Sequence, residues 1–151
     1  MIQRIQSVYL ALAFVITAVC LCLPIGVLSP EKTMGTDITM FNLWELRDNT
    51  LTFTTWPMFA LLLLSCVIAL YAIFSYKDRK RQIRLCNICI FLVVAWMVAF
   101  ALFAFVFADK DMAFSPQFAA GMPIVVLILY ILARRGIIHD EKLVRAADRI
   151  R

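Results

Sequence analysis

The chain contains four long runs of apolar residues, and charged residues gather between them. The charge-free stretches are residues 5–30, 49–76, 85–108 and 112–133. Each is at least as long as the roughly 20 residues that an α-helix needs to cross about 30 Å of hydrocarbon. None alternates polar with apolar residues, as the strands of a membrane barrel do. The pattern therefore predicts four transmembrane helices.

Residues typical of helix ends indicate that the spans are shorter than these runs. Trp56 prefers the membrane interface and Pro57 suits a first helical turn, so the second span is expected to begin there. Ser115 is a candidate N-cap, Pro116 suits the first helical position, and Gly136 is a candidate helix stop after the last span. The expected spans are residues 5–28, 56–76, 85–108 and 116–133.

The first span is expected to be a retained anchor. Its apolar core exceeds the about 7–15 residues of a signal peptide, and no small-residue cleavage site follows it. Val19 before Cys20 is too bulky for a lipoprotein acceptor site. Pro24 in this span and Pro123 in the fourth each remove a backbone donor, which predicts a bend or a frayed turn.

The connection between the first two spans has β-prone stretches at residues 38–46 and 51–56, with turn formers between them. This pattern predicts a short β-hairpin at the outer ends of the helices. Two strands alone are marginal in water. Phe41, Trp44 and Trp56 are therefore expected to pack on the bundle or its headgroup layer, or to contact a partner.

The end of the chain predicts an amphipathic helix over residues 140–151, following a bundle of residues 1–139. Asp140 is placed to cap this helix. Two interpretations remain open: a helix lying on the inner leaflet, or a docking helix for a partner protein. The candidate contact residues in this tail are Leu143, Val144, Arg145, Ala147, Arg149, Ile150 and Arg151.

Composition and charge fit a membrane protein. Apolar residues make up 64% of the chain and charged residues 17%, against about 45–50% and about 25% in soluble domains. Twelve of the 15 Lys and Arg residues lie near the N-terminus, in residues 77–84 or after residue 133. The positive-inside rule then predicts that both termini are cytoplasmic. This basic rim indicates contact with anionic lipid headgroups and no binding of nucleic acid.

The sequence predicts no catalytic residue, no cofactor and no metal site. The spans contain no Asp, Glu, Lys, Arg or His, which disfavours a pump or an ion-coupled carrier. Cys86 and Cys89 have the C-x-x-C spacing of dithiol redox sites, so a four-span membrane thiol oxidoreductase is an alternative function. Their position at the cytoplasmic end of the third span instead favours reduced packing residues.

Two segments resemble a known family. They are the start, MIQRIQSVYL at residues 1–10, and the end, with Arg135-Gly136-Ile137 followed by residues 140–145 and 148–151. The chain resembles an uncharacterised family of small four-span inner-membrane proteins of Bacteroidota, a domain of unknown function. The resemblance implies four helices, an inner-membrane location and no assigned activity.

Together these patterns predict an all-α membrane protein. Its expected architecture is an antiparallel four-transmembrane-helix bundle with a short outer β-hairpin loop and a cytoplasmic amphipathic tail helix. By elimination, the predicted function is that of an accessory or assembly subunit that binds a membrane or cytosolic partner. A lipid-binding or small-molecule carrier protein is a second alternative.

Overall fold

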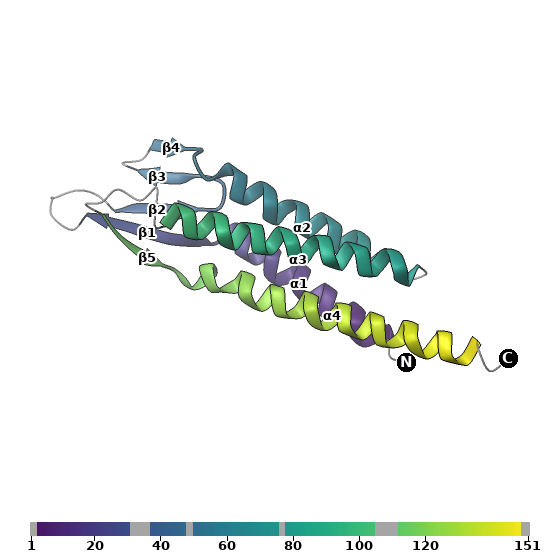
Figure 1. Ribbon diagram of the computed structural model, residues 1–151. Coiled ribbons are helices and arrows are strands. Elements are labelled where there is room, and N and C mark those ends of the chain that lie inside the picture. The colour runs from purple at the N-terminus through teal and green to yellow at the C-terminus, as the bar shows by residue number, and fades with distance from the viewer. Residues whose placement is uncertain (1–2, 31–36, 48–49, 76–77, 105–111, 149–151) are drawn as a thin grey trace.

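The computed structural model describes residues 3–30, 37–47, 50–75, 78–104 and 112–148. In these residues, four helices lie side by side and an antiparallel sheet extends from one end of them (Figure 1). All four helices are long and apolar enough to cross a membrane, in agreement with the sequence prediction. The elements are α1 (Gln3–Cys22), β1 (Pro24–Pro30), β2 (Ile38–Phe41), β3 (Glu45–Arg47), β4 (Thr50–Thr52), α2 (Trp56–Phe74), α3 (Arg79–Leu102), β5 (Met112–Pro116) and α4 (Phe118–Asp148).

Helix α1 ends earlier than the pattern predicts. It stops at Cys22, and Pro24 opens strand β1, so residues 24–28 of the expected span are a strand. Proline lacks a backbone N–H and disfavours helical geometry in the residue before it. Pro24 therefore ends the helix instead of bending it, and the apolar residues that follow enter the sheet.

The connection between α2 and α3 is shorter than predicted, because α3 begins at Arg79 rather than near residue 85. The carboxylate of Asp78 accepts a hydrogen bond from the backbone N–H of Arg81 at 3.2 Å, which caps the helix. Arg79, Lys80, Arg81 and Arg84 therefore lie in the first turns of α3, whereas Lys77 is outside the described residues. Helix α2 begins at Trp56, as predicted. Residues 105–108, at the end of the third predicted span, lie outside the described residues.

Helix α4 departs from the sequence prediction at both ends. Ser115 and Pro116 do not cap it, because they pair with Val27 and Gly26 in the sheet. Gly136 does not stop it either, since α4 continues without a break to Asp148. A side-chain Cβ at position 136 would lie 3.0 Å from Cγ of Gln6, so the glycine leaves room for α1 to approach closely.

The sheet has five strands in the order β4-β3-β2-β1-β5, and all pairs are antiparallel. The predicted hairpin is present as β3 and β4, where Arg47 pairs with Thr50. The predicted first strand is divided into β2 and β3, because the backbone N–H of Phe41 donates to the carbonyl of Trp44 at 2.8 Å. Strands β1 and β5, which flank helices, complete a sheet that two strands alone would not stabilise.

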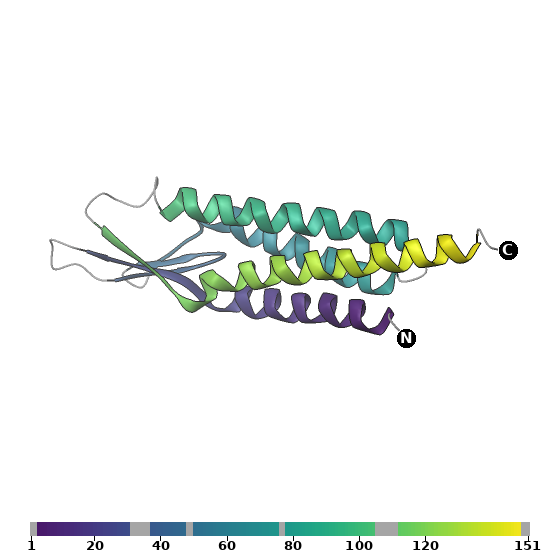
Figure 2. The same ribbon diagram turned by 60° about the horizontal axis from the view of Figure 1, so that its bottom comes forward.

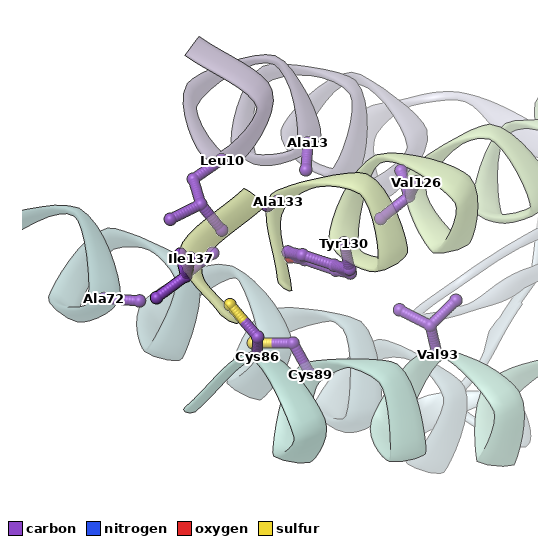
Figure 3. Close-up of a cluster of buried hydrophobic side chains, with 11 residues drawn as sticks. Leu10, Ala13, Ala72, Cys86, Cys89, Val93, Val126, Tyr130, Ala133 and Ile137 are labelled. Atoms are coloured by element: carbon purple, nitrogen blue, oxygen red, sulfur yellow. The ribbon is translucent and has the colours of Figure 1, made fainter. Parts of the chain in front are cut away.

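Two clusters of buried side chains form the core. The first lies among the helices and contains Leu10, Ala13, Ala69, Ala72, Cys86, Cys89, Val93, Val126, Tyr130, Ala133 and Ile137 (Figure 3). The second lies where the helices meet the sheet and contains Cys20, Ile25, Met40, Met58, Leu62, Trp96 and Ala119. The sheet is therefore packed onto the bundle and is part of the same core.

Replacing Gly26 with alanine tests this junction. The new Cβ would lie 2.5 Å from Cε2 of Phe114, a ring that packs edge-on against Phe100 at 5.6 Å. We expect this overpacking to lower the free energy of unfolding by about 1–2 kcal/mol.

The measurement is SDS titration of the protein in bicelles, with Gly121→Ala as the matched control. Nothing lies within 4 Å of a Cβ at Gly121, which is exposed on α4. This control is expected to stabilise the protein by about 0.5–1 kcal/mol. Equal effects of the two substitutions would contradict the packing argument.

Candidate functional site

The structure places the predicted contact residues at opposite ends of the molecule. Trp44 follows β2 and Trp56 begins α2, both beside the sheet, whereas Leu143 and Val144 lie near the end of α4 (Figure 1). The two groups of candidate residues are therefore separate surfaces. Arg145 and Ala147 belong to the last turns of α4. Arg149, Ile150 and Arg151 lie outside the described residues.

At the sheet end, the three candidate aromatic residues have different surroundings. Phe41 and Trp44 are partly buried, and their ring centroids lie 5.5 Å apart. The carbonyl of Phe41 accepts a hydrogen bond from the Thr55 hydroxyl at 3.0 Å. Trp56 is 59% exposed. Phe41 and Trp44 thus pack at the turn between β2 and β3. Of the three aromatic residues, Trp56 is the one that is mostly exposed.

Asn42 is a buried residue of this end that the sequence analysis missed. Its side-chain amide donates to the carbonyl of Cys20 at 2.8 Å, and its side-chain oxygen accepts from the Trp96 indole at 3.0 Å. Asn42 therefore ties the β2–β3 turn to α1 and α3. In the sequence it is one polar residue in a connection, where asparagine is common for its turn-forming geometry.

At the other end, α4 extends beyond the rest of the bundle. Both views show its last turns passing the start of α1, the end of α2 and the start of α3 (Figures 1 and 2). On this projecting part, Leu143 is 50% exposed and Val144 is 45% exposed. Residues 140–148 of the expected tail thus continue α4 without a break and do not form a separate helix.

Three helices meet at the base of this tail. The side-chain amide of Gln6 donates to the carboxylate of Asp140, and both residues are buried. The guanidinium of Arg79 donates to the carbonyl of Asp140 at 3.1 Å. We call Gln6, Arg79, Gly136 and Asp140 the tail base. These contacts join α1, α3 and α4 and brace the projecting part of α4 against the bundle.

The tail base unites the two segments that carry the family resemblance. Gln6 belongs to the N-terminal segment, and Gly136 and Asp140 belong to the C-terminal one. They are far apart in the chain, yet Gln6 contacts both residues of α4. The distinctive ends of the sequence therefore form one structural unit.

A polar layer crosses the middle of the bundle, with one residue from each helix: Thr17, Ser65, Cys89 and Tyr130. The Thr17 hydroxyl donates to the carbonyl of Ala13 at 2.7 Å, and the Cys89 thiol donates to the carbonyl of Ser65 at 3.6 Å. The Tyr130 hydroxyl lies beside those of Thr17 and Ser65, without the geometry of a hydrogen bond to either. The Thr17 hydroxyl thus finds its acceptor within its own helix, and the Cys89 thiol finds its acceptor on the neighbouring helix α2.

Cys86 and Cys89 face Tyr130 within the first cluster, and neither is exposed (Figure 3). All five cysteines are free thiols. Among the described residues, no three His, Cys, Asp or Glu side chains come together in a way that would hold a metal ion. Cys86 and Cys89 pack in this buried cluster. Reactive thiols, by contrast, are accessible and lie where their surroundings stabilise the thiolate.

Replacing both Cys86 and Cys89 with alanine is expected to leave the biological activity unchanged. The loss of two buried sulfur atoms should lower the free energy of unfolding by about 1–2 kcal/mol. Complementation of a deletion strain, with the protein level measured in parallel, checks this expectation. Loss of complementation at normal protein level, with a mixed disulfide trapped on the wild-type chain, would support the oxidoreductase alternative.

Comparison with known proteins identifies a family to which the chain is similar. The family model described as "Domain of unknown function (DUF4293)" matches residues 2–150. This match confirms the resemblance to an uncharacterised family that the two ends of the sequence suggested. A comparison with curated proteins gave no match.

Proposed function

The chain belongs to this family of unknown function, and we propose that it is a bacterial inner-membrane protein that holds a partner protein at the projecting end of α4. In this role it is an accessory or assembly subunit and performs no catalysis itself. The single observation that carries the proposal is the unbroken, braced extension of α4 beyond the bundle.

Membrane insertion is supported by the outer faces of the helices. Four helices have the length and apolarity of spans. Large apolar side chains on these helices are exposed, among them Val67 at 58% and Phe91 at 72%. In water, an apolar surface of this extent would drive aggregation, whereas lipid chains solvate it.

Cytoplasmic termini are supported by the distribution of charge in three dimensions. The start of α1, the start of α3 and the end of α4 lie at one end of the bundle (Figure 1). Nine of the 15 Lys and Arg residues lie in these described parts of the helices. By the positive-inside rule this end faces the cytoplasm, and the sheet faces the other side of the membrane.

The direction of α4 favours docking over a helix lying on the leaflet. A helix that lies on the membrane has to turn away from the span that precedes it. Here Gly136 is helical, and the bond from Gln6 to Asp140 holds the tail in line with the span. Leu143 and Val144 are then carried into the cytoplasm, and Lys142 and Arg145 flank them in the sequence. This surface fits a partner with an apolar groove and an acidic rim.

Affinity purification in mild detergent tests the docking surface. Leu143→Ser combined with Val144→Ser removes the exposed apolar contact and leaves the tail base intact. We expect this variant to lose a stoichiometric partner that the wild-type chain and the matched control Ala146→Ser retain. Because the surface is basic, the retained complex should also weaken as salt is raised.

Identical co-purified proteins for the wild-type chain and the double variant would contradict tail docking. Anionic phospholipid as the sole companion of the wild-type chain would instead favour the lipid-binding alternative.

A further inference from the structure

The segment that links the sheet to α2 has no charged residue and is exposed except at Thr55. It runs from Thr50 to Pro57 with the sequence TLTFTTWP. Leu51 is 57% exposed, Phe53 is 60% exposed and Trp56 is 59% exposed. Strand β4, which contains Leu51, lies at the edge of the sheet and pairs with β3 on one side. Three large apolar side chains, separated by threonines, are thus exposed within six residues of chain.

This exposed surface continues an exposed stripe of α2. Trp56 begins the helix, and residues at helical spacing after it are also exposed: Leu63 at 44%, Val67 at 58%, Leu70 at 41% and Phe74 at 72%. Positions three or four residues apart lie on one face of a helix. Trp56 is therefore the first member of the face that α2 turns away from the bundle, and Phe53 and Leu51 extend that face toward the sheet.

The segment is held firmly in this position. Thr55 is buried between the exposed residues, and its hydroxyl donates to the carbonyl of Phe41 at 3.0 Å. Its own carbonyl accepts the backbone N–H of Met58 at 3.0 Å and so starts the helix. The apolar side chains on either side of Thr55 are thereby fixed outward, at the level where α2 meets the sheet.

We propose that Leu51, Phe53 and Trp56 form an anchor in the phospholipid headgroup layer on the sheet side of the membrane. The proposal rests on the membrane insertion proposed above and on the continuity of these residues with the lipid-facing stripe of α2. Aromatic side chains, tryptophan above all, favour this layer because an apolar ring meets water there. The starts of α2 and α4 lie at the same end of the bundle (Figure 1), and Phe118, the first residue of α4, is 83% exposed.

The anchor does two things for the molecule. It sets the depth of the bundle in the bilayer, since α2 cannot slide without moving aromatic rings out of the headgroup layer. It also places the outer edge of β4 among lipid headgroups.

Spin-label accessibility in reconstituted vesicles of phosphatidylcholine and phosphatidylglycerol tests the anchor. The background is the full-length chain with Cys22→Ser, which removes the exposed thiol and leaves the four buried ones. Labels are then placed singly by Leu51→Cys, Phe53→Cys and Trp56→Cys. Oxygen, which is enriched in lipid, and the nickel chelate NiEDDA, which is confined to water, report the surroundings of each label.

Two control positions calibrate the measurement. Val67→Cys places a label midway along the exposed stripe of α2, and Asp37→Cys places one at an exposed position directly before strand β2. We expect the ratio of oxygen to NiEDDA accessibility to rise severalfold from Leu51→Cys through Phe53→Cys to Trp56→Cys. All three should fall between the two controls.

Three results would overturn the anchor. NiEDDA accessibility of Phe53→Cys and Leu51→Cys equal to that of Asp37→Cys, with Val67→Cys in lipid, would show that the segment faces water. Low accessibility of both labels to both reagents would show that protein covers it, either a second copy or a partner. High NiEDDA accessibility of Val67→Cys would show that α2 is not in lipid. This result would contradict both the proposed membrane insertion and the anchor.

Discussion

Replacing Trp96 with alanine is expected to lower the free energy of unfolding by about 3–5 kcal/mol. Trp96 is fully buried at the junction of the bundle and the sheet, and its ring stacks on Phe100 at 5.2 Å. Its indole N–H is also the donor to the buried side-chain oxygen of Asn42. The substitution would leave both a large cavity and an unsatisfied acceptor, and each of these costs stability.

SDS titration of the protein in bicelles measures this effect, with two companion variants. Trp96→Phe keeps most of the ring volume and removes the hydrogen bond, so it isolates a loss of about 1–3 kcal/mol. Phe91→Ala is the matched control on the same helix, because that ring is 72% exposed and faces away from the core. A loss for Trp96→Ala no greater than that for Phe91→Ala would contradict the packing described here.

Breaking the contact between Gln6 and Asp140 is the second large effect that we expect. Gln6→Leu would leave a buried carboxylate without its donor, and Asp140→Ala would leave a buried amide without its acceptor. A buried polar group that loses its partner costs about 1–3 kcal/mol, and a charged one costs more. We therefore expect Gln6→Leu to lower the free energy of unfolding by about 3 kcal/mol.

A double-mutant cycle separates this contact from its surroundings. The double variant should lose less stability than the two single variants together, with a coupling of about 0.5–3 kcal/mol. Arg81→Ala serves as the control, because Arg81 and Asp78 form an ion pair 3.5 Å apart at the surface, worth at most about 1 kcal/mol. Additive losses for Gln6 and Asp140 would show that the two residues do not act on each other.

The same contact connects stability to the proposed function. If the tail base holds α4 straight, Gln6→Leu should weaken partner binding although Gln6 is remote from Leu143 and Val144 in the chain. The purification experiment with Ala146→Ser as control detects this. Full partner binding by a folded Gln6→Leu variant would mean that the direction of the tail does not matter for docking.

The sequence by itself determined the four helices. Each long apolar run has to satisfy its backbone polar groups internally if it lies in hydrocarbon, and the helix is the structure that does so. Trp56 with Pro57 marked the start of α2, and the β-prone residues after Ile38 indicated strands. The one-sided distribution of Lys and Arg could also be predicted, because it depends only on where these residues occur relative to the apolar runs.

Tertiary structure decided the features that depend on partners distant in the chain. Strand β1 pairs with β5 across more than eighty residues, and both stretches had the composition of helix ends. Asn42 gained its role from Trp96 and Cys20, neither of which is near it in sequence. Gly136 is a common helix stop, yet α4 continues there because α1 packs closely against it and Gln6 bonds to Asp140. Local propensities are worth about 1 kcal/mol per residue, and contacts between packed elements outweigh them.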